Sequence, residues 1–244
     1  MTEWAVELKD VRKTYRTGPI EVAALRGLSL QIAPGEFVAT AGPSGSGKTT
    51  LLNIIGGLDR ADSGEMWVAG QNLQLLSSGD LSDLRLRRIG FVFQTYNLLP
   101  VLTAFENAEF TLLLQGVPAA QRRARVGKLF SEIGLSGLED RRPADLSGGQ
   151  QQRVAVARAM VTEPALILAD EPTANLDSTT AIALLDVMEH LNRATGTTFI
   201  FSTHDPQVME RAHRMIRLQD GRIVSDVTRG SQEAAGAGAA TPSA

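Results

Sequence analysis

The sequence predicts an α/β fold in which a parallel β-sheet core carries an antiparallel β subdomain and a helical subdomain. Strand-like and helix-like segments alternate along most of the 244 residues, which is typical of a parallel sheet covered by helices. Residues 103–161 interrupt this alternation, because they are largely helical, with breaks at Pro118 and Pro143 and no convincing strand. Residues 6–15 and 21–32 alternate polar and apolar side chains around a Gly-Pro turn, which predicts an antiparallel pair.

The remaining elements follow along the chain, and short apolar runs mark the buried strands. Residues 165–170 suit a parallel strand covered on both faces, because their apolar run is continuous. The other expected strands are residues 36–42, 65–70, 89–93, 197–203, 214–219 and 222–227. The further expected helices are residues 48–58, 81–87, 178–194 and 206–212. We expect one domain over residues 4–228, with its helical subdomain at about residues 95–161.

Composition narrows the classes of function. A net charge of −3 and a pI near 5.7 argue against a protein that coats nucleic acid. The chain has no cysteine and three histidines, which disfavours disulfides and zinc sites. No apolar run is long enough to cross a membrane, and the first residues do not look like a signal peptide. We therefore expect a soluble cytoplasmic protein, with a disordered tail over residues 229–244 that is too poor in large apolar residues to fold.

A complete phosphate-binding loop follows the strand expected at residues 36–42. It reads Gly42-Pro43-Ser44-Gly45-Ser46-Gly47-Lys48-Thr49, the pattern G-x-x-x-x-G-K-[ST]. Glycines let backbone N–H groups approach phosphates, and the following helix directs its positive end toward them. We expect Lys48 to reach the β- and γ-phosphates of a nucleotide and the Thr49 hydroxyl to bind Mg²⁺.

A second turn suited to phosphate lies far along the chain, directly before an Ala- and Arg-rich helix. It reads Leu146-Ser147-Gly148-Gly149-Gln150. One nucleotide needs only one cradle of backbone amides. Two different cradles in one chain therefore suggest that two copies face each other, each completing the site of the other.

Polar side chains end several of the buried strands. Asp170 and Glu171 follow the strand at residues 165–170, where Asp170 can hold Mg²⁺ and Glu171 can polarise the attacking water. His204 follows the strand at residues 197–203, at the edge where a parallel sheet binds ligands. Gln94 ends a further apolar strand, although a lone Gln at such a position is usually only a loop residue.

Together these motifs resemble the ATP-binding subunit of ATP-binding-cassette (ABC) transporters over roughly residues 4–228. In that family the fold is a P-loop NTPase core of the RecA-like type. The loop at 42–49 corresponds to Walker A, residues 166–171 to Walker B, residues 146–150 to the family signature and residues 175–177 to the D-loop. The resemblance implies ATP and Mg²⁺ as cofactors, with Glu171, His204 and Gln94 as catalytic residues and Thr49, Gln94 and Asp170 at the metal. It implies that the nucleotide is bound by Tyr15, Gly42, Pro43, Ser44, Gly45, Ser46, Gly47, Lys48, Thr49, Thr50, Ser147, Gly148, Gly149, Gln150 and Asp177.

The resemblance also implies a mechanism that depends on a homodimer. Two ATP molecules are sandwiched head to tail, each between Walker A of one copy and the signature of the other. Tyr15 stacks on adenine, Glu171 activates water, and His204 and Gln94 contact the γ-phosphate, the water or Mg²⁺. Asp177 lies across the dimer interface. Closure on ATP and release after hydrolysis then drive a membrane partner.

A finer resemblance is to the branch that serves lipoprotein release, macrolide or peptide export, and cell division. The segments at residues 51–59 and 90–107 carry it, whereas Ala174 and the pair Gln151-Gln152 depart from the common pattern without affecting hydrolysis. This branch implies a permease with four transmembrane helices and an extracytoplasmic domain, reached from the cytoplasmic face of the membrane. The residues expected to help form its docking groove are Tyr96, Leu98, Leu99 and Leu102.

Other readings stay open. The same ATPase could act as a mechanical signal relay in cell division, without transport. A cassette for DNA repair is disfavoured because the segment between Gln94 and Leu146 is too short for a coiled coil, and a ribosomal cassette because the chain has one cassette rather than two. A degenerate ATP-binding regulator is disfavoured by the intact Lys48, Asp170 and Glu171. The cargo, the permease and the type of cell envelope are not readable from the sequence.

Overall fold

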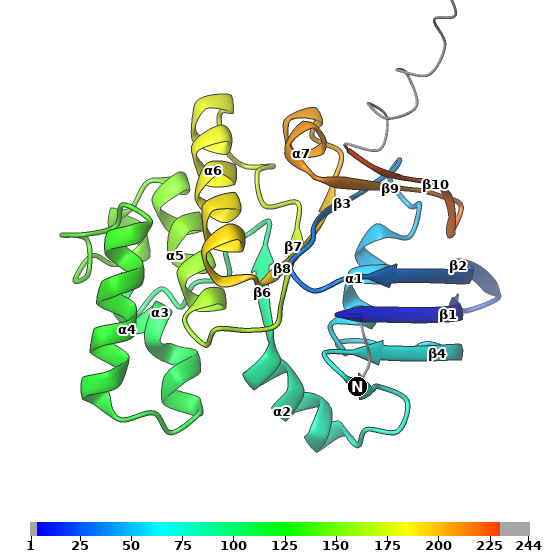
Figure 1. Ribbon diagram of the computed structural model, residues 1–244, viewed down its shortest axis with the longest axis horizontal. Helices are drawn as coiled ribbons and strands as arrows, with labels where there is room; N and C mark the ends of the chain where they lie inside the picture. Colours follow the sequence, from blue (N-terminus) through cyan, green and yellow to red (C-terminus); the bar gives the residue numbers. More distant parts are fainter. Residues whose placement is uncertain (1–3, 230–244) are drawn as a thin grey trace, which may run out of the picture.

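The structure is a computed structural model that describes residues 4–229, and this part of the chain contains two β-sheets and a group of helices (Figure 1). The larger sheet has the strand order β10-β9-β3-β8-β7-β6. Its strands are β3 (Phe37–Ala41), β6 (Ile89–Phe93), β7 (Leu166–Asp170), β8 (Thr198–Thr203), β9 (Arg214–Gln219) and β10 (Arg222–Thr228). All neighbours in it run parallel except β9 and β10.

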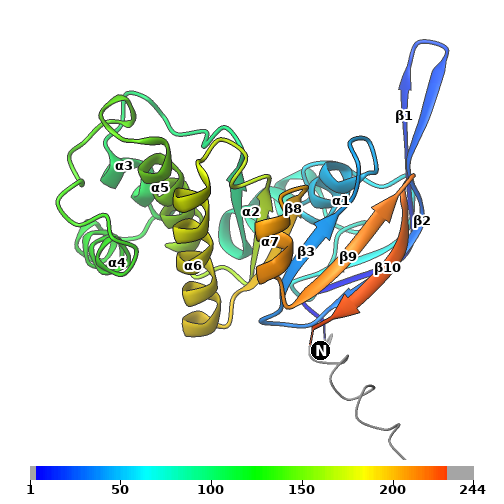
Figure 2. The same ribbon diagram turned by 90° about the horizontal axis from the view of Figure 1, so that it is seen from above.

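The smaller sheet is antiparallel, with the order β2-β1-β4-β5. Its strands are β1 (Val6–Thr17), β2 (Ile20–Ile32), β4 (Ser63–Val68) and β5 (Gln71–Asn72). The hairpin of β1 and β2 projects away from the rest of the described chain (Figure 2). Within it Tyr15 pairs with Val22, so these two residues lie opposite each other across the strands.

The helices are α1 (Lys48–Ile55), α2 (Ser78–Arg88), α3 (Ala104–Leu114), α4 (Ala119–Glu132), the 3₁₀ helix η1 (Pro143–Asp145), α5 (Gly148–Met160), α6 (Ser178–Thr195) and α7 (Pro206–Arg211). Helices α3, α4 and α5 lie together at one end of the molecule, with the larger sheet between them and the antiparallel sheet (Figures 1 and 2). Capping boxes begin three of these helices, at Ser77, Thr103 and Ser147. The arrangement confirms the predicted fold class.

Strand β7 shows why a continuous apolar run is needed at the centre of the larger sheet. Ile167 and Ala169 belong to the apolar core on the side of the helical group. Leu166 and Leu168 belong to the core between the two sheets and α1. Because successive side chains point to opposite faces, both faces must be apolar until the strand ends at Asp170, at the carboxyl edge of the sheet.

The element boundaries depart from the sequence prediction in a few places. The helix expected over residues 48–58 ends at Ile55, since Gly56 closes it and Gly57 adopts a left-handed φ of 61°. The helix expected at residues 81–87 begins earlier, where Ser77 and Asp80 form its capping box. Strand β5 was not predicted. The limits of the domain and of its helical subdomain stay predictions, and the expected tail, apart from Arg229, lies outside the described residues.

Candidate functional site

The phosphate-binding loop connects β3 to α1, and its conformation requires glycine at two positions. A Cβ on Gly42, where φ is 155°, would lie 2.2 Å from the carbonyl oxygen of Leu218. A Cβ on Gly47, where φ is 103°, would lie 2.6 Å from the carbonyl oxygen of Ala24. Gly47 is also the N-cap of α1 and brings no side chain to its first N–H groups. These amides are therefore free of side-chain caps, which suits the binding of phosphate.

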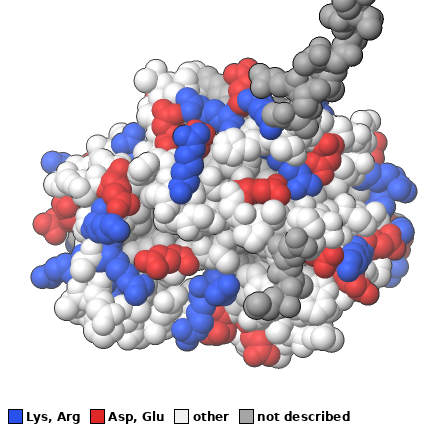
Figure 3. Space-filling model, viewed as in Figure 1, with Lys and Arg blue, Asp and Glu red and all other residues white. Residues whose placement is uncertain are grey.

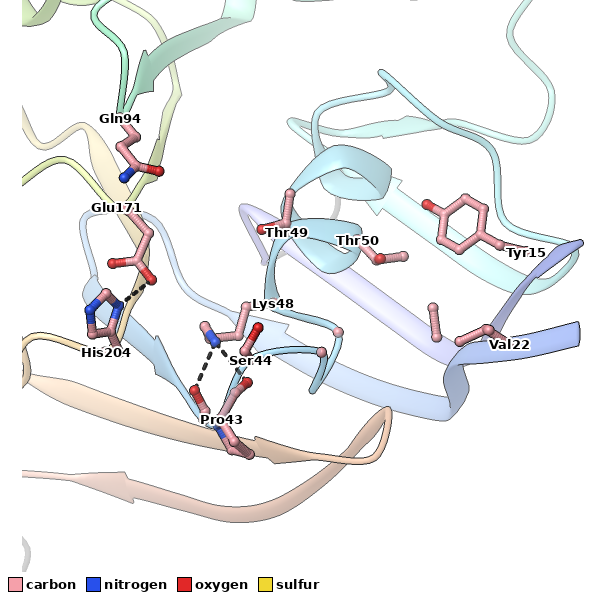
Figure 4. Close-up of a pocket in the computed structure, with 14 residues that line it drawn as sticks. Tyr15, Val22, Pro43, Ser44, Lys48, Thr49, Thr50, Gln94, Glu171 and His204 are labelled. Carbon is pink, nitrogen blue, oxygen red and sulfur yellow. Dashed lines mark hydrogen bonds and ion pairs between the residues drawn. The ribbon is translucent and has the colours of Figure 1, made fainter. Parts of the chain in front are cut away.

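Lys48 extends its ammonium group back across this loop. Its Nζ atom donates to the carbonyl oxygens of Gly42 at 2.7 Å and Pro43 at 3.1 Å (Figure 4). The side chain lines the cavity although only 9% of the residue is exposed. Since carbonyl oxygens leave its positive charge uncompensated, the ammonium group is available to an anion in the cavity.

The cavity over this loop has a volume of about 660 Å³, large enough for a nucleotide. It brings together most of the predicted site residues. Those that line it are Tyr15, Gly42, Pro43, Ser44, Gly45, Gly47, Lys48, Thr49, Thr50, Gln94, Glu171 and His204. Ser46 does not line it, and its hydroxyl is buried without a hydrogen-bond partner. Figure 4 shows Tyr15 on one side of the loop, with Glu171, His204 and Gln94 on the other.

Glu171 is held at the carboxyl edge of the sheet by its backbone and by one oxygen of its side chain. Its φ is 48°, and its backbone N–H donates to the carbonyl oxygen of Ser202 at 2.9 Å. Nδ1 of His204 lies 2.8 Å from Oε1 of Glu171. The other oxygen, Oε2, is buried without a hydrogen-bond partner. Because Glu171 lines the cavity and His204 orients its carboxylate, this group can accept a proton from a water molecule there.

The oxygen donors suited to a metal ion lie beside the phosphate loop. The Thr49 hydroxyl donates to Oδ1 of Asp170 at 3.3 Å, and Gln94 lines the same cavity. Among the described residues there is no cluster of three or more His, Cys, Asp or Glu side chains that could enclose a metal. A hydroxyl with one carboxylate fits Mg²⁺, which is usually bound by few protein oxygens together with substrate phosphates.

The signature residues and Asp177 do not line this cavity. Ser147 caps α5, its hydroxyl accepts from the N–H of Gln150, and the Gln150 side chain accepts from the N–H of Ser147. Asp177 caps α6 and binds the N–H and hydroxyl of Thr180. The hydrogen bonds from Thr180 lower the pKa of Asp177. The two helix starts are adjacent, because a Cβ on Gly149 would lie 2.3 Å from Cγ2 of Thr180.

Sequence reasoning missed two residues of the cavity and one contact. Val22 and Ala24 line the cavity from β2, beside Tyr15. The pairing of the predicted hairpin could have indicated them, because it places Val22 opposite Tyr15. The side-chain amide of Asn175 donates to the carbonyl oxygen of Gln94 at 2.9 Å. No local pattern could have indicated that contact, because the residues are far apart in the sequence.

The chain is similar to known ATP-binding proteins of membrane transport systems. The family model described as ABC transporter matches residues 25–174. The macrolide export ATP-binding/permease protein MacB of Syntrophobacter fumaroxidans is 50% identical over 220 residues, which are 89% of this chain and 31% of that protein. The lipoprotein-releasing system ATP-binding protein LolD of Anaeromyxobacter dehalogenans is 47% identical over 222 residues, which are 91% of this chain and 93% of that protein. The chain thus spans about a third of the macrolide exporter and nearly all of the LolD protein.

The fold is similar to that of a solved dimer. That structure shows the ATP-binding cassette MJ0796 in a post-hydrolysis state, bound to ADP and Pi. The likeness has a TM-score of 0.84 at 41% identity and covers 91% of this chain and 98% of that chain. These matches confirm the resemblance that the motifs indicate.

Proposed function

The chain belongs to the ABC transporter family as an ATPase subunit, and from that premise we propose that two copies close on ATP to drive a separate membrane permease. The work done is export, or the extraction of a lipoprotein, lipid or peptide. One observation carries the dimer: the cavity of a single chain holds the phosphate loop and Glu171 but none of residues 147–150. The site is therefore incomplete until a second copy supplies its signature. The dimeric MJ0796 cassette supports this step.

The chemistry is assigned to groups that line the cavity, together with Asp170, which does not line it but accepts a hydrogen bond from Thr49. Lys48 and the amides of the phosphate loop hold the β- and γ-phosphates, and the signature of the second copy contacts the γ-phosphate from the other side. Bound Mg²⁺, held by Thr49, Asp170 and Gln94, supplies charge neutralisation between the phosphates. Glu171 takes a proton from the attacking water, while its contact with His204 orients the carboxylate.

The partner is proposed to bind at a second cavity, which is lined by residues of α2, strand β6 and helices α3 and α5. It has a volume of about 580 Å³, and the apolar and aromatic residues that line it include Leu58, Phe91, Phe93 and Leu114. Asn97 also lines it, whereas Tyr96, Leu98, Leu99 and Leu102, which we expected at the groove, do not. An apolar cavity of this size suits a short helix of a permease.

The described surface supports a protein partner rather than nucleic acid. On the face in Figure 3, Lys and Arg side chains are interspersed with Asp and Glu instead of gathering into a basic strip. Within residues 4–229, no helix combines the length and apolar character needed to cross a bilayer. We therefore propose that the chain acts at the cytoplasmic face of the membrane and is held there by its permease.

The test is co-purification of tagged Glu171→Gln protein from solubilised membranes in the presence of ATP, followed by mass spectrometry. Lys48→Ala protein is the matched control, since it should bind ATP more weakly and therefore close on ATP less often. A four-helix permease with an extracytoplasmic domain, enriched over the control, supports the proposal. Cell-wall hydrolase regulators beside that permease would favour the signalling alternative instead. Recovery only with ribosomes or DNA would contradict both.

A further inference from the structure

The side chains of Lys13, Tyr15 and Asp59 form a cluster beside the nucleotide cavity. The Tyr15 hydroxyl donates to Oδ2 of Asp59 at 2.7 Å, and Lys13 Nζ donates to Oδ1 of Asp59 at 2.8 Å. The same Nζ lies 5.0 Å from the centroid of the Tyr15 ring. Tyr15 lines the nucleotide cavity, whereas Lys13 and Asp59 do not. These two residues therefore hold the ring without occupying the space that a ligand would fill.

The cluster links the strand that carries Tyr15 to the helix that carries the phosphate site. Lys13 and Tyr15 are two residues apart on β1, and both of their side chains reach the Asp59 carboxylate. Asp59 follows α1, and its backbone N–H donates to the carbonyl oxygen of Asn53 in that helix at 3.2 Å. The N–H of Arg60 donates to Oδ1 of Asp59 at 2.7 Å, which fixes the carboxylate. The orientation of the Tyr15 ring is thereby set relative to α1, which begins at Lys48.

The charges of the cluster reinforce this geometry. Burial raises the pKa of Asp59, but hydrogen bonds from Lys13, Tyr15 and the backbone of Arg60 outweigh it, so that the pKa is lowered. Burial and the neighbouring Asp59 raise the pKa of Tyr15. At neutral pH the phenol is therefore the donor and the carboxylate the acceptor. Charge-assisted hydrogen bonds of this kind are about twice as strong as neutral ones.

We propose that Asp59 is a positioning residue for the nucleotide base, because it fixes the Tyr15 ring against which the base stacks. The inference rests on the proposed role of Tyr15 as the residue that stacks on adenine. Tyr15 as a whole residue is 38% exposed and lines the cavity, which leaves surface open to a base. A ring already held in place loses less conformational freedom on binding than a mobile one, and affinity rises accordingly. The sequence separates the two residues by 44 positions, so no local motif indicates the pair.

The experiment compares ADP, which is not hydrolysed, with pyrophosphate, which carries phosphates without a base. ADP affinity is measured by isothermal titration calorimetry and pyrophosphate affinity by its competition with ADP. Asp59→Ala should weaken ADP binding about 3- to 10-fold, which is a fraction of the contribution of base stacking. Its affinity for pyrophosphate should stay within about twofold of the wild-type value. Asp59→Asn keeps an acceptor for the phenol, so its ADP affinity should lie between those of Asp59→Ala and wild type. Tyr15→Ala combined with Asp59→Ala should bind ADP no more weakly than Tyr15→Ala alone.

The matched control is Glu21→Ala, which removes a carboxylate from the same hairpin, where it pairs with Arg16 at the exposed surface. It should leave both affinities unchanged. Equal weakening of ADP and pyrophosphate by Asp59→Ala, or an additive loss in the double variant, would show that Asp59 acts on the phosphate site and overturn the inference. If Tyr15→Ala lowers the affinity for ADP but not for pyrophosphate, and Asp59→Ala changes neither affinity, the inference fails while the stacking role of Tyr15 stands. If Tyr15→Ala leaves ADP affinity unchanged, the stacking role that the family resemblance implies for Tyr15 fails along with the inference.

Discussion

Replacing Glu171 with Gln tests the assignment of the catalytic base most directly. The amide has nearly the volume of the carboxylate, and its oxygen can keep the contact with His204 that Oε1 makes at 2.8 Å. The change therefore keeps the size of the side chain and this contact, and removes the ability of the carboxylate to accept a proton. General base catalysis contributes about 10²- to 10⁴-fold. At about 1.4 kcal/mol per tenfold change, the barrier should rise by about 3–5 kcal/mol.

The assay measures phosphate release, ATP affinity and oligomeric state on the same preparation. Turnover of Glu171→Gln should fall at least 100-fold, ATP affinity should stay within about threefold of wild type, and a dimer should persist in ATP by light scattering. Glu163→Gln is the matched control, because Glu163 also has a positive φ, of 52°, but lies outside the nucleotide cavity. Hydrolysis by Glu171→Gln at the wild-type rate would refute the assignment. A loss of ATP binding would show that Glu171 supports the fold of the site instead.

Three further predictions concern the phosphate loop, the signature and the Asp59 cluster. Lys48→Ala should weaken ATP binding about 10- to 100-fold in calorimetry, since it removes charge-assisted hydrogen bonds to phosphate, and an unchanged affinity would contradict the loop assignment. Gly149→Ala should lower Tm and abolish the ATP dimer, because its Cβ would collide with Thr180. The control Gly127→Ala has open space around its Cβ and should raise Tm by a few degrees in the same thermal scan. The lowered pKa of Asp59 means that its stabilisation is present above the ordinary value of 3.8 and lost as pH falls through the lowered pKa. The Tm difference between wild type and Asp59→Ala should therefore shrink below about pH 4, and a difference that persists there would contradict the ionic origin of the contact.

The strands of the core and the residues at their ends could be predicted from the sequence because each depends on local pattern. The first four residues of β7 are apolar and the fifth is Asp170, and that pattern places Asp170 and the following Glu171 at the edge of a parallel sheet. The start of α2 was missed because Asp80 stands where a capping box more often has Glu. The pairing of Tyr15 with Asp59 could not be predicted, since it depends on how the loop after α1 packs against β1.

One buried side chain connects the signature helix to the catalytic loops of the same chain. Gln152 on α5 is fully buried, and its amide donates to the carbonyl oxygens of Pro172 at 2.8 Å and Phe93 at 3.3 Å. These carbonyls belong to the residues next to Glu171 and Gln94. Because α5 begins at the signature, a displacement of that helix in the proposed dimer would reach Glu171 and the Gln94 loop through the Gln152 amide. In the proposed dimer, this amide would join the face toward the chain's own nucleotide to the face toward that of its partner.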